Sequence, residues 1–189
     1  TDVLVVTDKA LKELGLPEQA LSGLTEAGVT LHWYADVDPD PTFAHVLEGR
    51  EVLRSAGCTA IVAVGGGSSM DAAKIIACTR SSDESPDQWV GLNKIPDDVL
   101  PVYAIPTTSG TGSEATMGAV IKDPAEQLKH IIVGDDLLPQ AVALDPDLLL
   151  GLPAAVTAAT GIDALTHGIE AYICIWDRGT RQENGRLAV

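Results

Sequence analysis

The sequence contains little positive charge. Its 12 lysines and arginines are outnumbered by 27 aspartates and glutamates, which gives a formal net charge of −15 at pH 7. Binding to nucleic acid requires a patch or stripe of Lys and Arg that neutralises phosphates, and no such run occurs here. We therefore expect no nucleic-acid partner. An acidic surface favours solubility and says little about the fold.

Long apolar runs and paired cysteines are also scarce. No stretch approaches the ~18 apolar residues that suggest a transmembrane helix, and residues 1–9 (TDVLVVTDK) do not have the pattern of a secretory signal peptide. The cysteines, Cys58, Cys78 and Cys174, are odd in number and too far apart for a CxxC or zinc-ribbon motif. We expect reduced core thiols in a cytoplasmic protein that has no membrane partner.

Aromatic residues make up only 4% of the chain, whereas 46% of it is hydrophobic and 18 residues are glycine. Aliphatic strands separated by glycine turns are typical of α/β proteins with a parallel sheet. Apolar runs alternate with helical patterns, which predicts right-handed βαβ crossovers. We expect strands at 3–7, 29–34, 60–64, 102–105, 119–122, 130–133 and 141–144, helices within 11–24, over 43–56 and after Ser69, and a surface excursion at 81–99.

The composition changes at Gly151. From Pro153 onward the pattern is helical, and proline suits a first helical turn. The sequence therefore predicts an α/β domain over residues 1–150 and the beginning of a helical domain over residues 151–189.

The first motif with chemical meaning is GGGSSMDAAK, at residues 65–74. It follows an apolar strand directly and opens a helix, so free backbone N–H groups and the positive end of the helix dipole meet at one place. This arrangement attracts phosphate, although a glycine-rich turn that binds no ligand has the same sequence pattern. The motif is neither GxGxxG nor a Walker loop.

The second motif is PTTSGTGSE, at residues 106–114, which also follows an apolar strand. Ligands of parallel α/β sheets bind outside the carboxyl ends of the strands. Hydroxyls placed there can bind pyrophosphate, ribose or a carboxamide. A solvated loop or an ordinary helix cap is the alternative.

The third motif is GIDALTH, at residues 161–167. Asp163 and His167 are four residues apart and therefore share one face of a helix. A carboxylate and an imidazole on one face can bind a divalent cation. A local Asp–His pair without a metal is the alternative.

Four segments, GGGSSMDAAK, AIPTTSGTGSEAT, LDPDLLLGLP and TAATGIDALTHGIEAYI, occur here in one order. Together they resemble the iron-containing (group III, metal-dependent) alcohol dehydrogenase family over about residues 1–174. The resemblance implies a parallel-sheet dinucleotide-binding α/β domain followed by the start of an all-helical domain, which is the dehydroquinate synthase-like architecture. It places catalysis in the cleft between the domains.

The resemblance also implies roles for individual residues. The pyrophosphate loop would consist of Gly65, Gly66, Gly67 and Ser68, with Asp71 close to the cofactor. The hydroxyl loop around the cofactor would consist of Thr107, Thr108, Thr111 and Gly112. Lys129 would reach the nicotinamide ribose, Leu148 would pack near the adenosine side, and Asp163 and His167 would be the first metal ligands.

The chain departs from the family pattern in its ligand set and in one cofactor residue. The family metal has one Asp and three His ligands, and the remaining two histidines would lie beyond residue 189, so we expect a truncated helical domain. Family members that prefer NAD often have an Asp after the second strand, and Ala35 stands at the matching position with Asp36 beside it. Asp36 is therefore a candidate ribose ligand, and the choice between NAD and NADP stays open.

The sequence predicts an oxidoreductase that transfers a hydride between a primary or small secondary alcohol and NAD or NADP. A divalent metal, Fe²⁺ or Zn²⁺, would polarise the alcohol oxygen. We expect the full-length enzyme to be a homodimer and residues 1–189 alone to be inactive. The alternatives are a catalytically inactive fragment that only binds dinucleotide, or a glycerol dehydrogenase-like or dehydroquinate synthase-like member of the same fold group.

Overall fold

A five-stranded parallel sheet with the strand order β2-β1-β3-β5-β8 is the central element of the computed structural model, which describes residues 1–174. Every neighbouring pair of strands in it is parallel. The strands are β1 (Asp2–Val6), β2 (Thr30–Tyr34), β3 (Ala60–Gly65), β5 (Val102–Pro106) and β8 (Ala141–Val142). The predicted α/β class and parallel sheet are confirmed.

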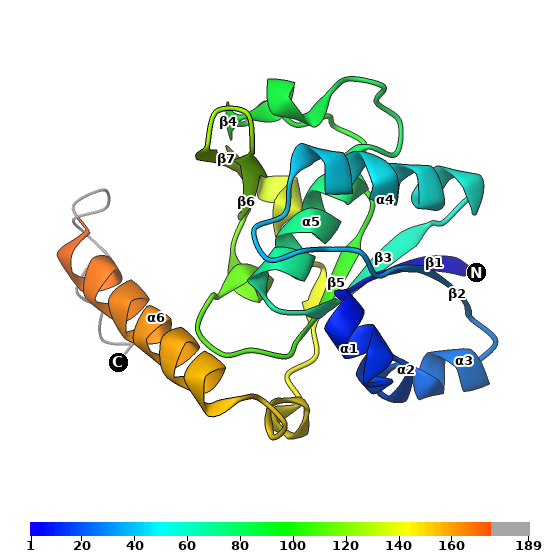
Figure 1. The fold of residues 1–189 in the computed structure, drawn as a ribbon. Coiled ribbons are helices and arrows are strands. Elements are labelled where there is room, and N and C mark those ends of the chain that lie inside the picture. Colours follow the sequence, from blue (N-terminus) through cyan, green and yellow to red (C-terminus); the bar gives the residue numbers. More distant parts are fainter. Residues whose placement is uncertain (175–189) are drawn as a thin grey trace.

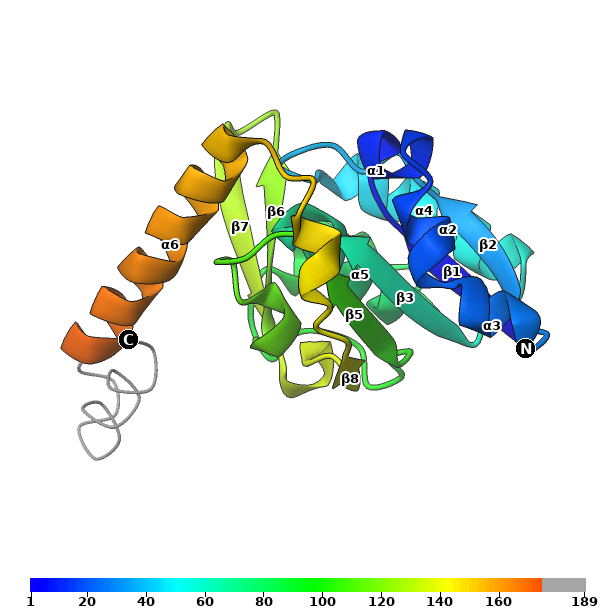
Figure 2. The same cartoon turned by 90° about the horizontal axis from the view of Figure 1, so that it is seen from below.

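Helices cover both faces of this sheet, as Figures 1 and 2 show. Side chains of β1 alternate between the two faces, as expected for a strand buried on both sides. Leu4 and Val6 join one core, whereas Val3 and Val5 join a second core with Leu21. One face carries α4 (Phe43–Ser55) and α5 (Gly67–Cys78), and the other carries α1 (Lys9–Glu13), α2 (Leu16–Ala20) and α3 (Ser22–Glu26).

A smaller sheet of three strands has the order β4-β7-β6. It consists of β4 (Gly91–Leu92), β7 (Leu128–Val133) and β6 (Gly118–Asp123), of which β6 and β7 form an antiparallel hairpin. The strands expected at 119–122 and 130–133 are therefore confirmed. Short 3-10 helices η1 (Pro86–Trp89), η2 (Ser113–Ala115), η3 (Asp135–Leu137) and η4 (Pro146–Leu149) connect the remaining segments.

Three expectations need correction. The 81–99 segment is not only a surface excursion, because it places Trp89 in the core at 1% exposure, where its indole N–H donates to Oε2 of Glu84 (3.0 Å). The helices expected within residues 11–24 are three short ones, because the chain divides first at Gly15, which adopts a left-handed φ of 69°, and again at Leu21. Cys58 and Cys78 are buried free thiols as expected, but Cys174 is exposed just after the last helix.

The last described element is α6 (Ala154–Ile173), which stands apart from the parallel sheet in both views (Figures 1 and 2). It begins immediately after Pro153, as the sequence predicts, and residues 175–189 of the expected helical segment lie outside the described residues. Among residues 1–174 no helix combines the length and the apolar character needed to cross a membrane.

The strand order identifies where a ligand would enter. The chain passes from β1 to its neighbour β2 and then returns to β3 on the other side of β1. The topological switch point therefore lies between the carboxyl ends of β1 and β3, the usual ligand crevice of an open α/β sheet. The glycine loop at residues 65–67 follows β3 at this point.

Candidate functional site

A cavity of about 500 Å³ lies between the start of α5, the β6–β7 hairpin and α6. Its lining residues come from segments far apart in the sequence. Among them are seven of the residues singled out in the sequence: Gly67, Ser68, Asp71, Thr111, Lys129, Asp163 and His167. The structure thus brings half of the predicted phosphate, cofactor and metal residues to one cavity, whereas Gly65, Gly66, Thr107, Thr108 and Gly112 do not line it.

The glycine loop presents its backbone to this cavity. Gly66 is the N-cap of α5 and makes no side-chain capping bond, so the first N–H groups of the helix are open to an anion. Side chains are excluded from the loop by close neighbours. A Cβ on Gly65 would lie 2.5 Å from Oγ of Ser69, and one on Gly67 would lie 3.1 Å from Cγ2 of Thr111.

The hydroxyl loop, residues 107–112, packs directly on the glycine loop. The N–H of Thr107 donates to the carbonyl of Gly65 (2.9 Å), and Thr107 is itself buried. The hydroxyl of Thr108 is buried and has no hydrogen-bond partner within residues 1–174. It would lie 3.2 Å from a Cβ on Gly66. An orphaned hydroxyl beside open helix N–H groups fits the phosphate oxygens of a dinucleotide.

Asp71 lines the cavity, but both of its carboxylate oxygens are engaged by the protein. Oδ1 accepts from the hydroxyl of Ser113 (2.6 Å) and Oδ2 accepts from the N–H of Val120 (2.9 Å). Burial raises the pKa of Asp71, although these two bonds act in the opposite direction. Asp71 therefore fixes the wall of the cavity.

Lys74 stands one turn further along α5 and was not singled out in the sequence. Its side chain is fully buried, and Nζ donates to the carbonyls of Thr116 (3.0 Å) and Gly118 (2.8 Å). Burial lowers the pKa of Lys74 to about 8, while the nearby Asp71 and Glu114 carboxylates act to raise it. Together Asp71 and Lys74 tie α5 to the segment that leads into β6.

Lys129 projects from β7 toward the cavity and pairs with a residue that the sequence did not indicate. Its Nζ lies 2.6 Å from Oδ1 of Asp40. The hydrogen bond from this ammonium lowers the pKa of Asp40. Asp40 adopts a left-handed φ of 60°, and its N–H donates to the hydroxyl of Ser68 (3.3 Å). The only feature of the sequence that could have indicated Asp40 is the acidic, proline-rich loop in which it lies.

Asp163 and His167 share one face of α6, as their spacing predicts. Oδ1 of Asp163 lies 3.8 Å from Nε2 of His167. Two ligands at about 2.1 Å from one tetrahedral ion are roughly 3.4 Å apart, so a small adjustment would bring both onto a divalent cation. Nδ1 of His167 lies 3.0 Å from the carbonyl oxygen of Gly110, which leaves Nε2 toward Asp163. The pair therefore fits an Fe²⁺ or Zn²⁺ ion.

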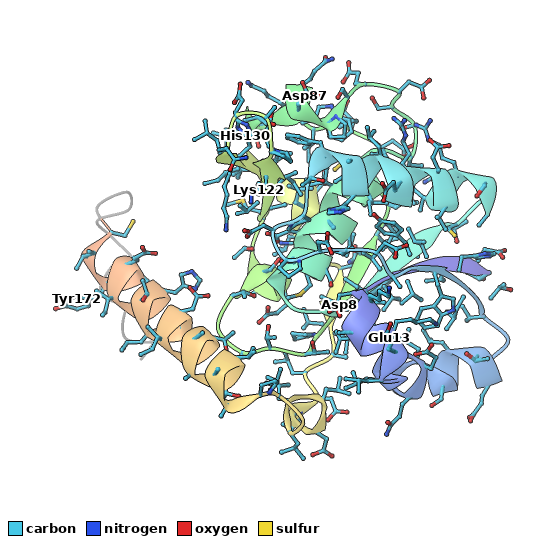
Figure 3. The ribbon with its side chains drawn as sticks, viewed as in Figure 1. Asp8, Glu13, Asp87, Lys122, His130 and Tyr172 are labelled. Carbon is cyan, nitrogen blue, oxygen red and sulfur yellow. The ribbon has the colours of Figure 1, made fainter. Side chains whose placement is uncertain are left out.

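Asp36 and Leu148 do not line this cavity. Asp36 is exposed in the loop after β2, and Leu148 is half-buried in η4. A carboxylate closer to the switch point is Asp8, which follows β1 and caps α1 by accepting from the N–H of Leu11 (2.9 Å). It lies at the start of that helix in Figure 3. The feature of the sequence that could have indicated Asp8 is its position directly after the strand β1.

A second group of metal-type ligands lies on the hairpin turn. Side chains of Asp123, Glu126 and His130 each offer a ligand atom within 4.8 Å of the others. His130 also packs near the ring of Phe43 (6.0 Å between centroids). Because Lys129 and Ile131 face the cavity and strand residues alternate, His130 points to the opposite side of β7. His130, labelled in Figure 3, is thus separate from the Asp163–His167 pair.

Comparison with known proteins identifies one family. Residues 1–146 match the family model described as iron-containing alcohol dehydrogenase. The chain is 41% identical over 170 residues to the NAD-dependent methanol dehydrogenase of Bacillus methanolicus. That match covers 90% of this chain and 45% of the relative, so the chain spans less than half the length of that relative.

Solved structures give the same result. The crystal structure of a 1,3-propanediol oxidoreductase superposes with a TM-score of 0.87 at 39% identity, over 92% of this chain and 45% of the other. The sulfoacetaldehyde reductase of Bifidobacterium kashiwanohense in complex with NAD⁺ superposes with a TM-score of 0.84 at 35% identity, over 94% of this chain and 46% of the other.

Proposed function

Because this chain belongs to the iron-containing alcohol dehydrogenase family, we propose that its cavity holds the nicotinamide end of a dinucleotide next to part of a divalent-metal site. The enzyme would transfer a hydride between a primary or small secondary alcohol and NAD or NADP. The observation that supports this most strongly is one cavity lined both by the start of α5, at Gly67 and Ser68, and by Asp163 and His167.

Different residues of this chain would bind the pyrophosphate, the nicotinamide ribose and the metal. N–H groups at Gly67 and Ser68 would bind the pyrophosphate, and the hydroxyl loop would complete its hydrogen bonds. Lys129 would donate to the nicotinamide ribose, in competition with its ion pair to Asp40. Asp163 and His167 would hold the metal, which when bound supplies a Lewis acid for the alcohol oxygen. The protein thereby orients the two reactants, which is the part of catalysis that fixed geometry provides.

We propose NAD rather than NADP as the cofactor. A carboxylate near the adenosine ribose accepts hydrogen bonds from its hydroxyls and repels a 2′-phosphate. Asp8 is better placed for this than Asp36, since it follows β1 at the switch point and α1 approaches the glycine loop there. Cδ1 of Leu11 would lie 3.6 Å from a Cβ on Gly65. The similarity to an NAD-dependent methanol dehydrogenase and to a sulfoacetaldehyde reductase in complex with NAD⁺ supports the same choice.

A second candidate is dinucleotide binding without turnover by residues 1–189. Two candidate metal ligands, Asp163 and His167, line the cavity with 3.8 Å between Oδ1 and Nε2, whereas the family resemblance implies four ligands. Each missing ligand removes part of the free energy of metal binding. Glycerol dehydrogenase-like activity gains no specific support from the cavity.

The decisive experiment measures cofactor binding by the 189-residue chain and turnover by the full-length enzyme. NAD⁺ and NADP⁺ are titrated calorimetrically against the chain, and short alcohols are assayed with the full-length enzyme and added Fe²⁺ or Zn²⁺. Binding of NAD⁺ with turnover by the full-length enzyme supports the dehydrogenase, and binding without turnover by that enzyme supports dinucleotide binding alone. No dinucleotide binding at millimolar concentration would overturn both.

A cytoplasmic location and a homodimer also belong to this proposal. The free thiols of Cys58 and Cys78 suit a reducing compartment. The homodimer rests on the family resemblance, and light scattering on the full-length enzyme would test it.

A further inference from the structure

The hydroxyl loop, residues 107–112, touches both halves of the proposed site. On one side it meets the glycine loop: Oγ1 of Thr108 would lie 3.2 Å from a Cβ on Gly66, and Oγ1 of Thr111 would lie 3.3 Å from one on Gly67. On its other side the loop meets α6. The segment is therefore a physical bridge between the dinucleotide subsite and the metal pair.

The contact with α6 is made by Gly110 and leaves no room for a side chain. A Cβ on Gly110 would lie 2.0 Å from the carbonyl oxygen of Thr160 and 2.8 Å from its carbonyl carbon. These are backbone atoms of a helix and cannot move aside as a flexible side chain can. Gly110 also has a φ of +114°, which L-residues adopt only with strain. Both properties require glycine at this position.

The carbonyl of Gly110 is also the hydrogen-bond partner of His167. Nδ1 of His167 lies 3.0 Å from this oxygen. A carbonyl can only accept, so Nδ1 must carry the proton of the neutral ring. In the neutral ring Nε2 is then the nitrogen without a proton, and it lies on the side of Asp163, 3.8 Å from Oδ1. This tautomer leaves a lone pair available for a metal on the side of the carboxylate.

We propose that Gly110 is a positioning residue that couples the two halves of the site: its carbonyl sets the tautomer and orientation of His167, and the loop that carries it packs on the dinucleotide subsite. The inference rests on the proposed function for the identity of the two ligands. A dinucleotide that orders the hydroxyl loop fixes the Gly110 carbonyl and so prepares His167 for a metal. By linkage, the metal strengthens dinucleotide binding by the same factor.

Two variants separate this contact from backbone strain. Gly110→Ala introduces the clash with Thr160. Gly91→Ala is the matched control, because Gly91 has nearly the same φ of +111° but its Cβ would meet only the end of the Lys94 side chain, at 3.5 Å. Gly91 does not line the cavity.

The first readout is the tautomer of His167, measured by two-bond ¹H–¹⁵N correlation of the histidine rings in the 189-residue chain at pH 8. The His167 signal is identified by its loss in His167→Gln. We expect the Nδ1–H form to predominate in wild type and in Gly91→Ala, and to be lost in Gly110→Ala. A wild-type ring in the Nε2–H form would overturn the inference without any variant.

The second readout is the affinity for Co²⁺ with and without saturating NAD⁺. We expect NAD⁺ to raise Co²⁺ affinity at least about 5-fold in wild type and in Gly91→Ala, the low end of couplings between sites, and to raise it less in Gly110→Ala. An unchanged ratio in Gly110→Ala overturns the coupling. Absence of NAD⁺ and Co²⁺ binding, together with the expected tautomer change, would instead refute the proposed function and leave the positioning role of Gly110 standing.

Discussion

Lys129 and Asp40 form an ion pair at the rim of the cavity, with Nζ 2.6 Å from Oδ1. The two residues come from β7 and from the loop that precedes α4, and both line the cavity. Lys129, the single lysine among the described residues that line the cavity, is therefore partly neutralised. We expect this ion pair to weaken the attraction of the cavity for a phosphate-bearing cofactor.

Asp40→Asn should tighten NAD⁺ binding by about 2–5-fold, because the ammonium of Lys129 is then free to contact the cofactor. The magnitude follows from the free energy of an exposed ion pair, which is roughly 0.2–1 kcal/mol. The free energy of unfolding should change by less than about 1 kcal/mol, since both side chains are partly exposed. Calorimetry measures the affinity. Asp98→Asn is the control, since it removes the same charge from the Arg80 pair outside the cavity. Equal tightening in both variants would contradict the role of Asp40.

Gly66→Asp should weaken NAD⁺ binding by more than about 10-fold, because a carboxylate at the N-cap of α5 would compete with the pyrophosphate for the same N–H groups. Gly66→Ala provides the matched control, because its methyl group meets the same Thr108 hydroxyl, at 3.2 Å, without adding a charge. Fluorescence titration gives both affinities. Similar affinities for the two variants would place the pyrophosphate elsewhere.

Lys74 should make stability depend on pH in the alkaline range. Its pKa of about 8 in the folded chain is below the ordinary value of 10.5, so between these values the unfolded chain binds the additional proton. Stability attributable to this group therefore rises with pH across that window, by roughly 3 kcal/mol at most. Urea unfolding of wild type and Lys74→Met from pH 7.5 to 10 isolates the effect. A constant difference between the two proteins would contradict the lowered pKa.

His167→Ala should reduce affinity for Co²⁺ by at least about 10-fold and leave NAD⁺ affinity within about 2-fold when no metal is present. The reason is that the imidazole is a metal ligand in the proposal, whereas the phosphate subsite lies at α5. His130→Ala is the matched control, since His130 lies on the other side of β7. Loss of Co²⁺ affinity in His130→Ala but not in His167→Ala would instead identify the hairpin cluster as the metal site.

Local features of the site were predictable from sequence, whereas long-range contacts were not. The glycine loop was predictable because strand, glycines and helix are contiguous, and the face shared by Asp163 and His167 follows from helical spacing. The bond from His167 to Gly110 joins residues 57 apart, and no local pattern encodes it. The burial of Trp89 was missed because polar, proline-containing neighbours surround it in the sequence.

The most direct test of the account is a crystal structure of the 189-residue chain soaked with NAD⁺. The account predicts the pyrophosphate at the N–H groups of Gly67 and Ser68 and the nicotinamide ring in the cavity, facing Asp163 and His167. A dinucleotide bound away from the start of α5, or with its nicotinamide turned away from the Asp163–His167 pair, would contradict it.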